Sequence, residues 1–496
     1  MTEHDKAGHV VSMNKNGNGN WPRWLTLSGL LLLALNACTT DASLGPRPDA
    51  GAPIDGSDSA EADGGAVIEP GTWARAVGGE YGASVHRVGV DTENHVFVAG
   101  RAAGRAEFGD GVGSTGAGPF YVASYTLEGG LRWATRLAGS DSSVGRRVDM
   151  AVGDAVVVSY VASSLGQLVV SALDRDSGAV RWTVALAASD EDAVAAVAVE
   201  PSGRVYAVGN FRGTLRAGAH AVSSVGWSDI FALAIEPNGE PAWLRAFATG
   251  STVRLVEADT LLWDGARLVF TGRFANSIAL GTRTLSIDGS GEFVAELDRD
   301  GVALGGSVLF EGDAAAEVEG MVSGADGRRY LVGRYRGTLN VGASTVSSTG
   351  TFDIFVASFE RDGTSRWVRS FGQGMRDGGS AIDWGRAVAM GADGTVYVGG
   401  AFNRSLQLET ATLDGPLGDA QSIMLLLRLD SAGNVLASKV GGVDYSEDMV
   451  NAVVPLPDGN VLVGGEMNRP GPVFAGLRAE TSLGDNGLGF VARIVF

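Results

Sequence analysis

The chain has very little cysteine and lysine, and each shortage excludes some classes of function. Cys38 is the only cysteine in 496 residues, which excludes an internal disulfide and a zinc site built from cysteine pairs. After Cys38 the only lysine is Lys439, and the formal net charge of the chain is −19. Proteins that bind nucleic acid present clusters of basic side chains to the phosphates. We therefore expect no nucleic-acid partner.

The sequence also lacks the short motifs of common catalytic sites. It contains no His-Glu-x-x-His zinc motif and no Gly-x-Ser-x-Gly elbow accompanied by triad partners. Only His86, His95 and His220 remain as histidines after the N-terminal region. No Asp-Gly pair lies in the alternating acidic pattern of an EF-hand loop. We therefore predict a protein that is not an enzyme and needs no cofactor.

Long apolar runs are scarce, and the clearest one lies near the N-terminus. The stretch Trp24–Leu35 follows basic residues, is too short to span a bilayer and ends at Asn36-Ala37-Cys38. This arrangement resembles the lipobox of bacterial lipoproteins. The resemblance implies that residues 1–37 are a signal peptide and that Cys38 carries the lipid. The alternative is a signal peptide followed by an incidental cysteine.

The segment after the cysteine predicts a flexible connection. Residues 38–71 are rich in Asp, Ala, Gly, Pro and Ser and have almost no large apolar side chains, so they form a disordered acidic tether. Thr39 stands where some bacteria place Asp as an inner-membrane retention signal, and the lipoprotein resemblance therefore favours the outer membrane. We expect a cell-envelope protein held to the membrane by the lipid on Cys38.

Glycine is abundant, with 74 residues, and tryptophan shows that the chain is repetitive. Tryptophans that open short alternating segments recur at Trp73, Trp133, Trp182, Trp243 and Trp367. Alignment of the preceding glycine turns places Gly305 and Ala437 in two further positions of the same series. Seven units of roughly 60 residues then fill residues 72–496, and a repeat of this length indicates a modular fold.

Each unit predicts four short β-strands. Asp-Gly turns such as Asp393-Gly394 and Asp362-Gly363 separate alternating apolar runs, a strong hairpin signal. Because no helical periodicity persists after the signal segment, we predict an all-β, seven-bladed β-propeller of four-stranded blades. Such a ring must close to cover its sheet edges. We expect Trp73–Val77 to complete the blade formed by Phe490–Phe496.

Two segments carry a family resemblance. Gly209–Leu215 and Gly333–Leu339 are each followed by Ser-Ser-x-Gly and then by Asp229-Ile230-Phe231 or Asp353-Ile354-Phe355. They resemble the SBBP repeats of bacterial surface β-propeller proteins, which implies a fold and a location but no catalytic residues. The segment Leu173–Trp182 resembles the tryptophan-docking repeat of quinoprotein-like propellers, which implies that its tryptophan packs between blades.

The loops that join one unit to the next are acidic and lie on one face of a propeller. This face could attract a cation or a basic partner. The candidate metal ligands are Asp190, Asp192, Asp313, Asp377, Asp444 and Asp448. The alternative is a solvated acidic rim that aids solubility.

A second candidate site lies where the first strands begin, at the mouth of the central channel. Alignment on the second strands places His86, Arg146, Ala195, Ala258, Glu319, Arg386 and Asn451 at equivalent positions. We predict that His86, Arg146, Glu319, Arg386 and Asn451 bind a small anionic or sugar ligand. An ordinary wet channel would contain similar residues.

Three functions fit these features. The first is a non-catalytic binding, adhesion or scaffolding module, with a protein or polysaccharide partner on the loop face near the insertions 403–421 and 467–488. The second is an extracellular enzyme acting on polysaccharide, which would place carboxylates with shifted pKa values together in the channel. The third is a periplasmic factor for outer-membrane assembly.

Overall fold

The computed structural model is built from β-strands. It describes residues 69–109, 118–139, 148–162, 167–187, 190–250, 256–311, 315–372, 382–408, 411–414, 421–442, 447–474, 476–483 and 487–496. Within these ranges no helix is long and apolar enough to cross a bilayer. The signal segment, Cys38 and nearly all of the tether lie outside the described residues.

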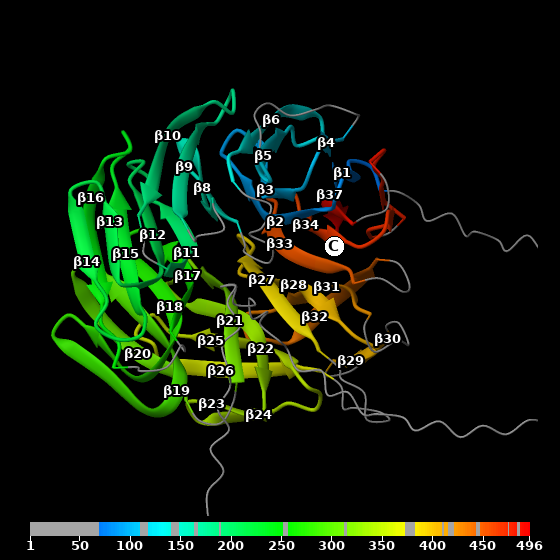
Figure 1. The fold of residues 1–496 in the computed structure, drawn as a ribbon. Coiled ribbons are helices and arrows are strands. Elements are labelled where there is room, and N and C mark those ends of the chain that lie inside the picture. Colours follow the sequence, from blue (N-terminus) through cyan, green and yellow to red (C-terminus); the bar gives the residue numbers. More distant parts are fainter. Residues whose placement is uncertain are drawn as a thin grey trace, which may run out of the picture. The chain divides into compact units, whose positions relative to one another are not determined.

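Seven antiparallel sheets, the blades, follow one another in chain order around a centre, as the sequence predicts (Figure 1). Blade 1 contains β2 (Ala83–Val90), β3 (Val96–Ala102), β5 (Phe120–Tyr125) and β6 (Leu131–Leu137). Blade 2 contains β7 (Asp149–Val152), β8 (Ala155–Val161), β9 (Leu168–Asp174) and β10 (Val180–Leu186). Blade 3 contains β11 (Asp190–Val199), β12 (Val205–Arg212), β15 (Asp229–Ile235) and β16 (Pro241–Phe247).

The remaining blades repeat this order. Blade 4 contains β17 (Glu257–Trp263), β18 (Leu268–Leu280), β19 (Arg283–Leu297) and β20 (Ala303–Glu311). Blade 5 contains β21 (Ala315–Ser323), β22 (Arg329–Arg336), β25 (Asp353–Phe359) and β26 (Ser365–Phe371). Blade 6 contains β27 (Trp384–Met390), β28 (Val396–Phe402), β31 (Ile423–Leu429) and β32 (Val435–Gly441). Blade 7 contains β33 (Met449–Pro455), β34 (Asn460–Met467), β37 (Leu488–Val495) and β1 (Trp73–Gly79), with β4 (Ala106–Phe108) added at its edge.

The insertions between second and third strands form small two-stranded sheets. These are β13 (Thr214–Ala217) with β14 (His220–Ser223), β23 (Thr338–Val341) with β24 (Ser344–Ser347), β29 (Ser405–Gln407) with β30 (Thr412–Asp414), and β35 (Gly471–Pro472) with β36 (Arg478–Ala479). In blade 4 the insertion instead lengthens β18 and β19 into one continuous hairpin.

The ring closes as the sequence predicts. β1 pairs antiparallel with β37, and Ala76 lies opposite Phe490. In Figure 1 the C-terminus lies beside β1 and β37, so strands from both ends of the propeller share one sheet. Hairpin turns use glycine where the backbone needs a positive φ, which is +82° at Gly394. Because β1 pairs with β37, the strand β37 is not left as an open sheet edge.

Burial follows the position of each strand in its blade. Every residue of β15 and β25 is buried because third strands are covered on both faces by neighbouring blades. First strands such as β21 are largely half-buried, since one side of each faces the channel. The core therefore consists of apolar layers between successive blades, and the channel holds the polar groups.

Tryptophan side chains tie neighbouring blades together, as the docking-repeat resemblance implies. The indole Nε1 of Trp133, at the edge of blade 1, donates to the carbonyl of Arg175 in blade 2 at 3.1 Å. The same bond to a turn of the next blade occurs for four more pairs, namely Trp73 with Leu127, Trp182 with Pro237, Trp243 with Arg299 and Trp367 with Ser431. The repeated tryptophan is therefore a structural residue.

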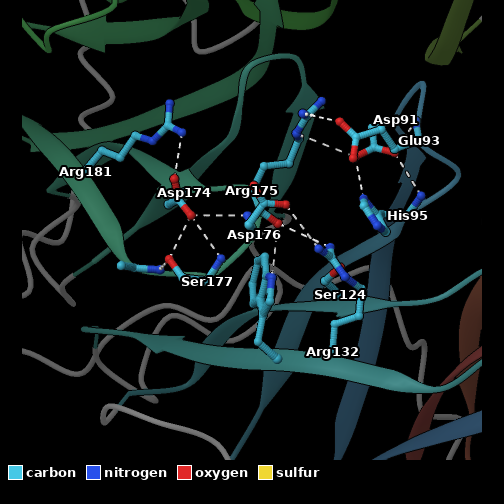
Figure 2. Close-up of polar contacts among 12 residues, drawn as sticks. Asp91, Glu93, His95, Ser124, Arg132, Asp174, Arg175, Asp176, Ser177 and Arg181 are labelled. Carbon is cyan, nitrogen blue, oxygen red and sulfur yellow. Dashed lines mark hydrogen bonds and ion pairs between the residues drawn. The ribbon is translucent and has the colours of Figure 1, made fainter.

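Figure 2 shows one of these docking turns in detail. The carboxylate of Asp174 accepts hydrogen bonds from the backbone N–H of Asp176 and Ser177, and from Arg181. Arg132 of the preceding blade reaches the Asp176 side chain at 3.2 Å. The turn is therefore held rigidly enough to present its carbonyl to the neighbouring indole.

Candidate functional site

A cavity of about 220 Å³ lies in the channel and is lined by the first strands of all seven blades. Its walls alternate between small apolar residues and ionisable or amide side chains. The lining residues that carry a charged or amide side chain are Arg87, Asp149, Asp259, Glu319, Arg386 and Asn451. The predicted ring therefore exists, and it includes the predicted Glu319, Arg386 and Asn451.

A β-bulge in the first strand explains much of this lining. The pairing of first and second strands skips one residue between Val318 and Gly320, and again between Gly385 and Ala387. Bulges also occur in blades 1, 3, 4 and 7. Because a bulge interrupts the alternation of side chains, it redirects the extra residue, here Glu319 or Arg386.

One aligned position, in blade 4, is wrong, and another, in blade 2, lies outside the described residues. In blade 4 the residue at the bulge is Asp259, so the alignment that chose the buried Ala258 was wrong by one position. In blade 2 the cavity is lined by Asp149, while Arg146 lies outside the described residues. The error arose because a bulge adds a residue without changing the apolar pattern from which the strand was predicted.

His86 joins two blades instead of lining the cavity. Its Nδ1 accepts a hydrogen bond from the backbone N–H of Val148 at 3.0 Å, and its Nε2 lies 2.9 Å from the hydroxyl of Ser84. An acceptor Nδ1 requires the proton of a neutral imidazole to sit on Nε2. Both ring nitrogens of His86 thus have partners within the protein, and its ligand-binding role stays a prediction.

The polar residues of blades 1 to 3 form one interblade contact. Arg87 and Asp149 form an ion pair at 2.5 Å, in which the arginine belongs to blade 1 and the aspartate to blade 2. The other oxygen of Asp149 accepts the backbone N–H of Val197 in blade 3 at 2.7 Å. Asp149 therefore holds three first strands together.

Similar contacts join blade 5 to blade 6 and, across the ring closure, blade 7 to blade 1. Glu319 accepts a hydrogen bond from Arg386 at 3.1 Å, and the Arg386 guanidinium lies 4.2 Å from the centre of the Trp384 ring. Asn451 donates to the carbonyl of Val85 at 3.0 Å, across the closure of the ring. These side chains are therefore held in place by contacts between blades.

Blade 4 departs from the repeat by burying a carboxyl group. Glu292 lies opposite Arg273 on the third strand and is 1% exposed. The equivalent third-strand positions of the other six blades hold Phe120, Leu168, Ile230, Ile354, Met424 and Gly489. Among the described residues, neither carboxyl oxygen of Glu292 accepts a hydrogen bond from an N–H group. A buried acid that breaks the period is a candidate for function rather than for blade structure.

Glu292 interacts with Asp259, the acid that lines the cavity. Burial raises the pKa of both carboxyl groups well above their ordinary values, and each negative charge opposes ionisation of the other. Arg273 lies 3.7 Å from Glu292 and opposes this rise without cancelling it. The pair therefore retains a proton under conditions in which an exposed carboxyl group has lost it.

The predicted metal ligands are mostly outside the part that the structure describes. This applies to Asp313, Asp377 and Asp444, and to the side chains of Asp190 and Asp192, whose backbone belongs to β11. Asp448 is fully buried, and its Oδ1 accepts the backbone N–H of Asn468 at 3.2 Å. No group of three or more potential ligands capable of holding a metal was found in the described residues. The metal site stays a prediction.

Comparisons with known proteins concern the fold. No protein-family model matches the chain, and no curated protein matches it. Solved structures include virginiamycin B lyase from Staphylococcus aureus, with 9% identity, a TM-score of 0.41, and coverage of 83% of this chain and 95% of that chain. An ulvan lyase of polysaccharide lyase family PL25 is 11% identical, with a TM-score of 0.42 and coverage of 84% and 95%. Quinohemoprotein alcohol dehydrogenase from Comamonas testosteroni is 11% identical, with a TM-score of 0.40 and coverage of 85% and 76%.

Proposed function

We propose that the protein is a binding propeller of the cell envelope, held to the membrane by a lipid on Cys38, whose channel cavity takes a sugar. The observation that carries this proposal is the prearranged ring of Arg87, Asp149, Glu319 and Arg386 around the cavity. Sugar hydroxyl groups both donate and accept hydrogen bonds, and the ring offers guanidinium donors beside carboxylate acceptors. The two ion pairs leave little net charge, which suits a neutral sugar.

The location rests on the N-terminal pattern and on the repeats. The lipobox-like segment ending at Cys38 supports lipid attachment, and the resemblance of blades 3 and 5 to SBBP repeats supports the cell surface. Metabolic labelling with a radioactive fatty acid should mark the protein and not its Cys38→Ser variant. Protease treatment of whole cells should remove the propeller. Retention of the label by the variant, or full protection from protease, would contradict the respective part of the proposal.

Calorimetry against a panel of neutral oligosaccharides tests the ligand. The double variant Arg87→Ala with Arg386→Ala should weaken binding at least tenfold, because it removes both guanidinium donors. Arg105→Ala provides a matched control, since its side chain is 78% exposed and lies outside the cavity. Unchanged binding in the double variant would place the sugar elsewhere.

A second function, the cleavage of a polysaccharide, is favoured by the Asp259 and Glu292 pair. A general acid must hold its proton near neutral pH and reach the substrate. Asp259 lines the cavity, and its pKa is raised by burial. If the protein cleaves the oligosaccharide that it binds, Asp259→Asn should remove turnover and retain binding. Binding without products in the unmodified protein would leave the non-catalytic function as the conclusion.

A further inference from the structure

The tryptophan that links neighbouring blades is missing between blades 4 and 5. Gly305 lies opposite Glu296, at the register where Trp243 lies opposite Ala234 and Trp367 opposite Ser358. This confirms the place of Gly305 in the tryptophan series. A Cβ atom added to Gly305 would meet nothing within 4 Å apart from its chain neighbours, and the receiving Gly363 is approached by the hydroxyl of Ser307 instead of by an indole.

The receiving turn of blade 5 nevertheless has the form of the others. Gly363 has a φ of +87° and donates its N–H to the carbonyl of Glu360 at 3.0 Å, which closes the turn. Gly301 has the same role in blade 4, where the indole of Trp243 packs against it. The carbonyl that accepts the indole N–H from Trp243 belongs to Arg299, and its equivalent in blade 5 belongs to Arg361.

At the second position of the series that lacks tryptophan, Ala437, another side chain of the protein occupies the space. Ala437 occupies the tryptophan register of blade 6, opposite Arg428. There the ring of Phe496 contacts Tyr397 edge-on, with the centroids 5.6 Å apart. Tyr206 and Trp243 form the corresponding pair in blade 3, with centroids 6.1 Å apart. An aromatic ring from another strand thus replaces the tryptophan.

Between blades 4 and 5 the space is instead a cavity of about 480 Å³. Its lining includes Arg267, Arg283, Arg329, Arg361, Glu296 and Asp362, together with Gly305 and Gly363. A small apolar cavity, which shares Val294, Arg329 and Gly363 with it, adjoins this space and is also lined by Leu309, Leu331 and Phe359. The site therefore combines an apolar end with a surplus of arginine.

Arg329, which lines this cavity, departs from the residue type found at the same position of other blades. The first residue of the second strand is valine at Val96, Val205 and Val396, whereas Arg329 is 3% exposed and forms an ion pair with Glu296. Its Nε is buried and has no hydrogen-bond partner in the described part of the chain. Burial of an arginine is unfavourable unless its donors are satisfied. Arg329 therefore places a buried cation at the wall of the cavity.

We propose that this interblade cavity binds an indole that carries a carboxylate, in the position that tryptophan occupies between the other blades. The ring packs against Gly363, and its N–H donates to the carbonyl of Arg361. The carboxylate pairs with the arginine side chains, of which Arg283 is exposed and has no ion pair among the described residues. A free indole acid and a tryptophan in an acidic polypeptide share this chemistry.

Calorimetry with N-acetyl-L-tryptophan as the probe tests the proposal on the intact propeller. We expect saturable binding that is at least tenfold weaker for N-acetyl-L-tryptophanamide, which lacks the carboxylate. Gly305→Trp should abolish binding by filling the cavity, whereas Ala437→Trp, at the position served by Phe496, should leave it unchanged. An acidic tryptophan-containing peptide that binds more tightly than the free probe would identify a polypeptide as the natural source.

A further variant guards against misfolding. Arg283→Ala removes an arginine side chain that is exposed and has no ion pair in the described part of the chain, and it should weaken binding of the probe at least tenfold while the melting temperature stays unchanged. The channel variants at Arg87 and Arg386 should bind the probe normally, which separates this site from the proposed sugar site. Absence of saturable binding, or binding that survives Gly305→Trp in a folded protein, would overturn the proposal.

Discussion

Trp73 lies directly opposite Arg493 on neighbouring antiparallel strands, so a strand from the start of the propeller completes the blade that contains its C-terminal strand. The same tryptophan then donates its indole N–H to Leu127 in blade 1 at 2.9 Å. One short strand therefore both closes blade 7 and links blade 7 to blade 1. Closure joins segments from the two ends of the propeller, and its loss should affect the entire ring.

Ala76→Pro should destabilise the propeller by about 2–3 kcal/mol. Proline removes a backbone donor from the middle of β1, at a residue that lies opposite Phe490 of β37. Thermal unfolding followed by circular dichroism should show a lower midpoint. Glu69→Pro, at an exposed residue outside β1, provides the control and should have little effect. Equal midpoints for both variants would show that closure by β1 does not limit stability.

Trp243→Ala should cost about 3–5 kcal/mol, since it empties a buried interblade position and removes a hydrogen bond to Arg299. Trp182→Ala should cost less, because Trp182 is only partly buried although it makes the same bond, to Pro237. Chemical denaturation measures both changes. A larger loss at Trp182 would mean that the hydrogen bond, rather than burial, dominates the contribution of these tryptophans.

Glu292→Gln should stabilise the protein at neutral and alkaline pH. Burial raises the pKa of Glu292 above its ordinary value near 4.5, so the folded state binds more protons than the unfolded state between these two values. Stability is therefore complete below the unfolded pKa and falls as pH rises toward the folded pKa. Glutamine remains neutral and avoids this loss, which we expect to be about 1–3 kcal/mol.

Melting temperatures from pH 4 to pH 8 test this expectation. The advantage of Glu292→Gln should shrink toward pH 4, where the unmodified carboxyl group is protonated in both states. Glu480→Gln changes an acid whose side chain is 67% exposed, and it should show no such pH dependence. A constant difference across the range would indicate that the raised pKa does not govern the effect.

Asp149→Ala should destabilise the ring by about 3–5 kcal/mol. It leaves the Arg87 guanidinium without its ion pair and the backbone N–H of Val197 without its acceptor. Asp154→Ala, in the exposed turn of the same blade, should change stability by less than about 0.5 kcal/mol. Similar small effects in both variants would show that the interblade contact of Asp149 contributes little.

The repeat and the closure could be predicted from the sequence because they depend on local patterns. Tryptophan spacing and Asp-Gly turns indicate how many blades there are and where each blade begins, and both can be read directly from the sequence. The same phase located Gly305 and Ala437 in the tryptophan register, which the strand pairing confirms. Glu319, Arg386 and Asn451 were predicted in the channel for the same reason.

Only the tertiary structure decided what those positions contact, because the contacts join different blades. A bulge placed Asp259 rather than Ala258 at the cavity. Packing within blade 4 brought Glu292 close to Asp259. Gly305 and Ala437 look alike in sequence, yet Phe496 fills the position beside Tyr397 while the space beside Gly305 is a cavity. Alternation along one strand specifies which side chains are buried, whereas the partner of each buried side chain depends on the register of the next blade.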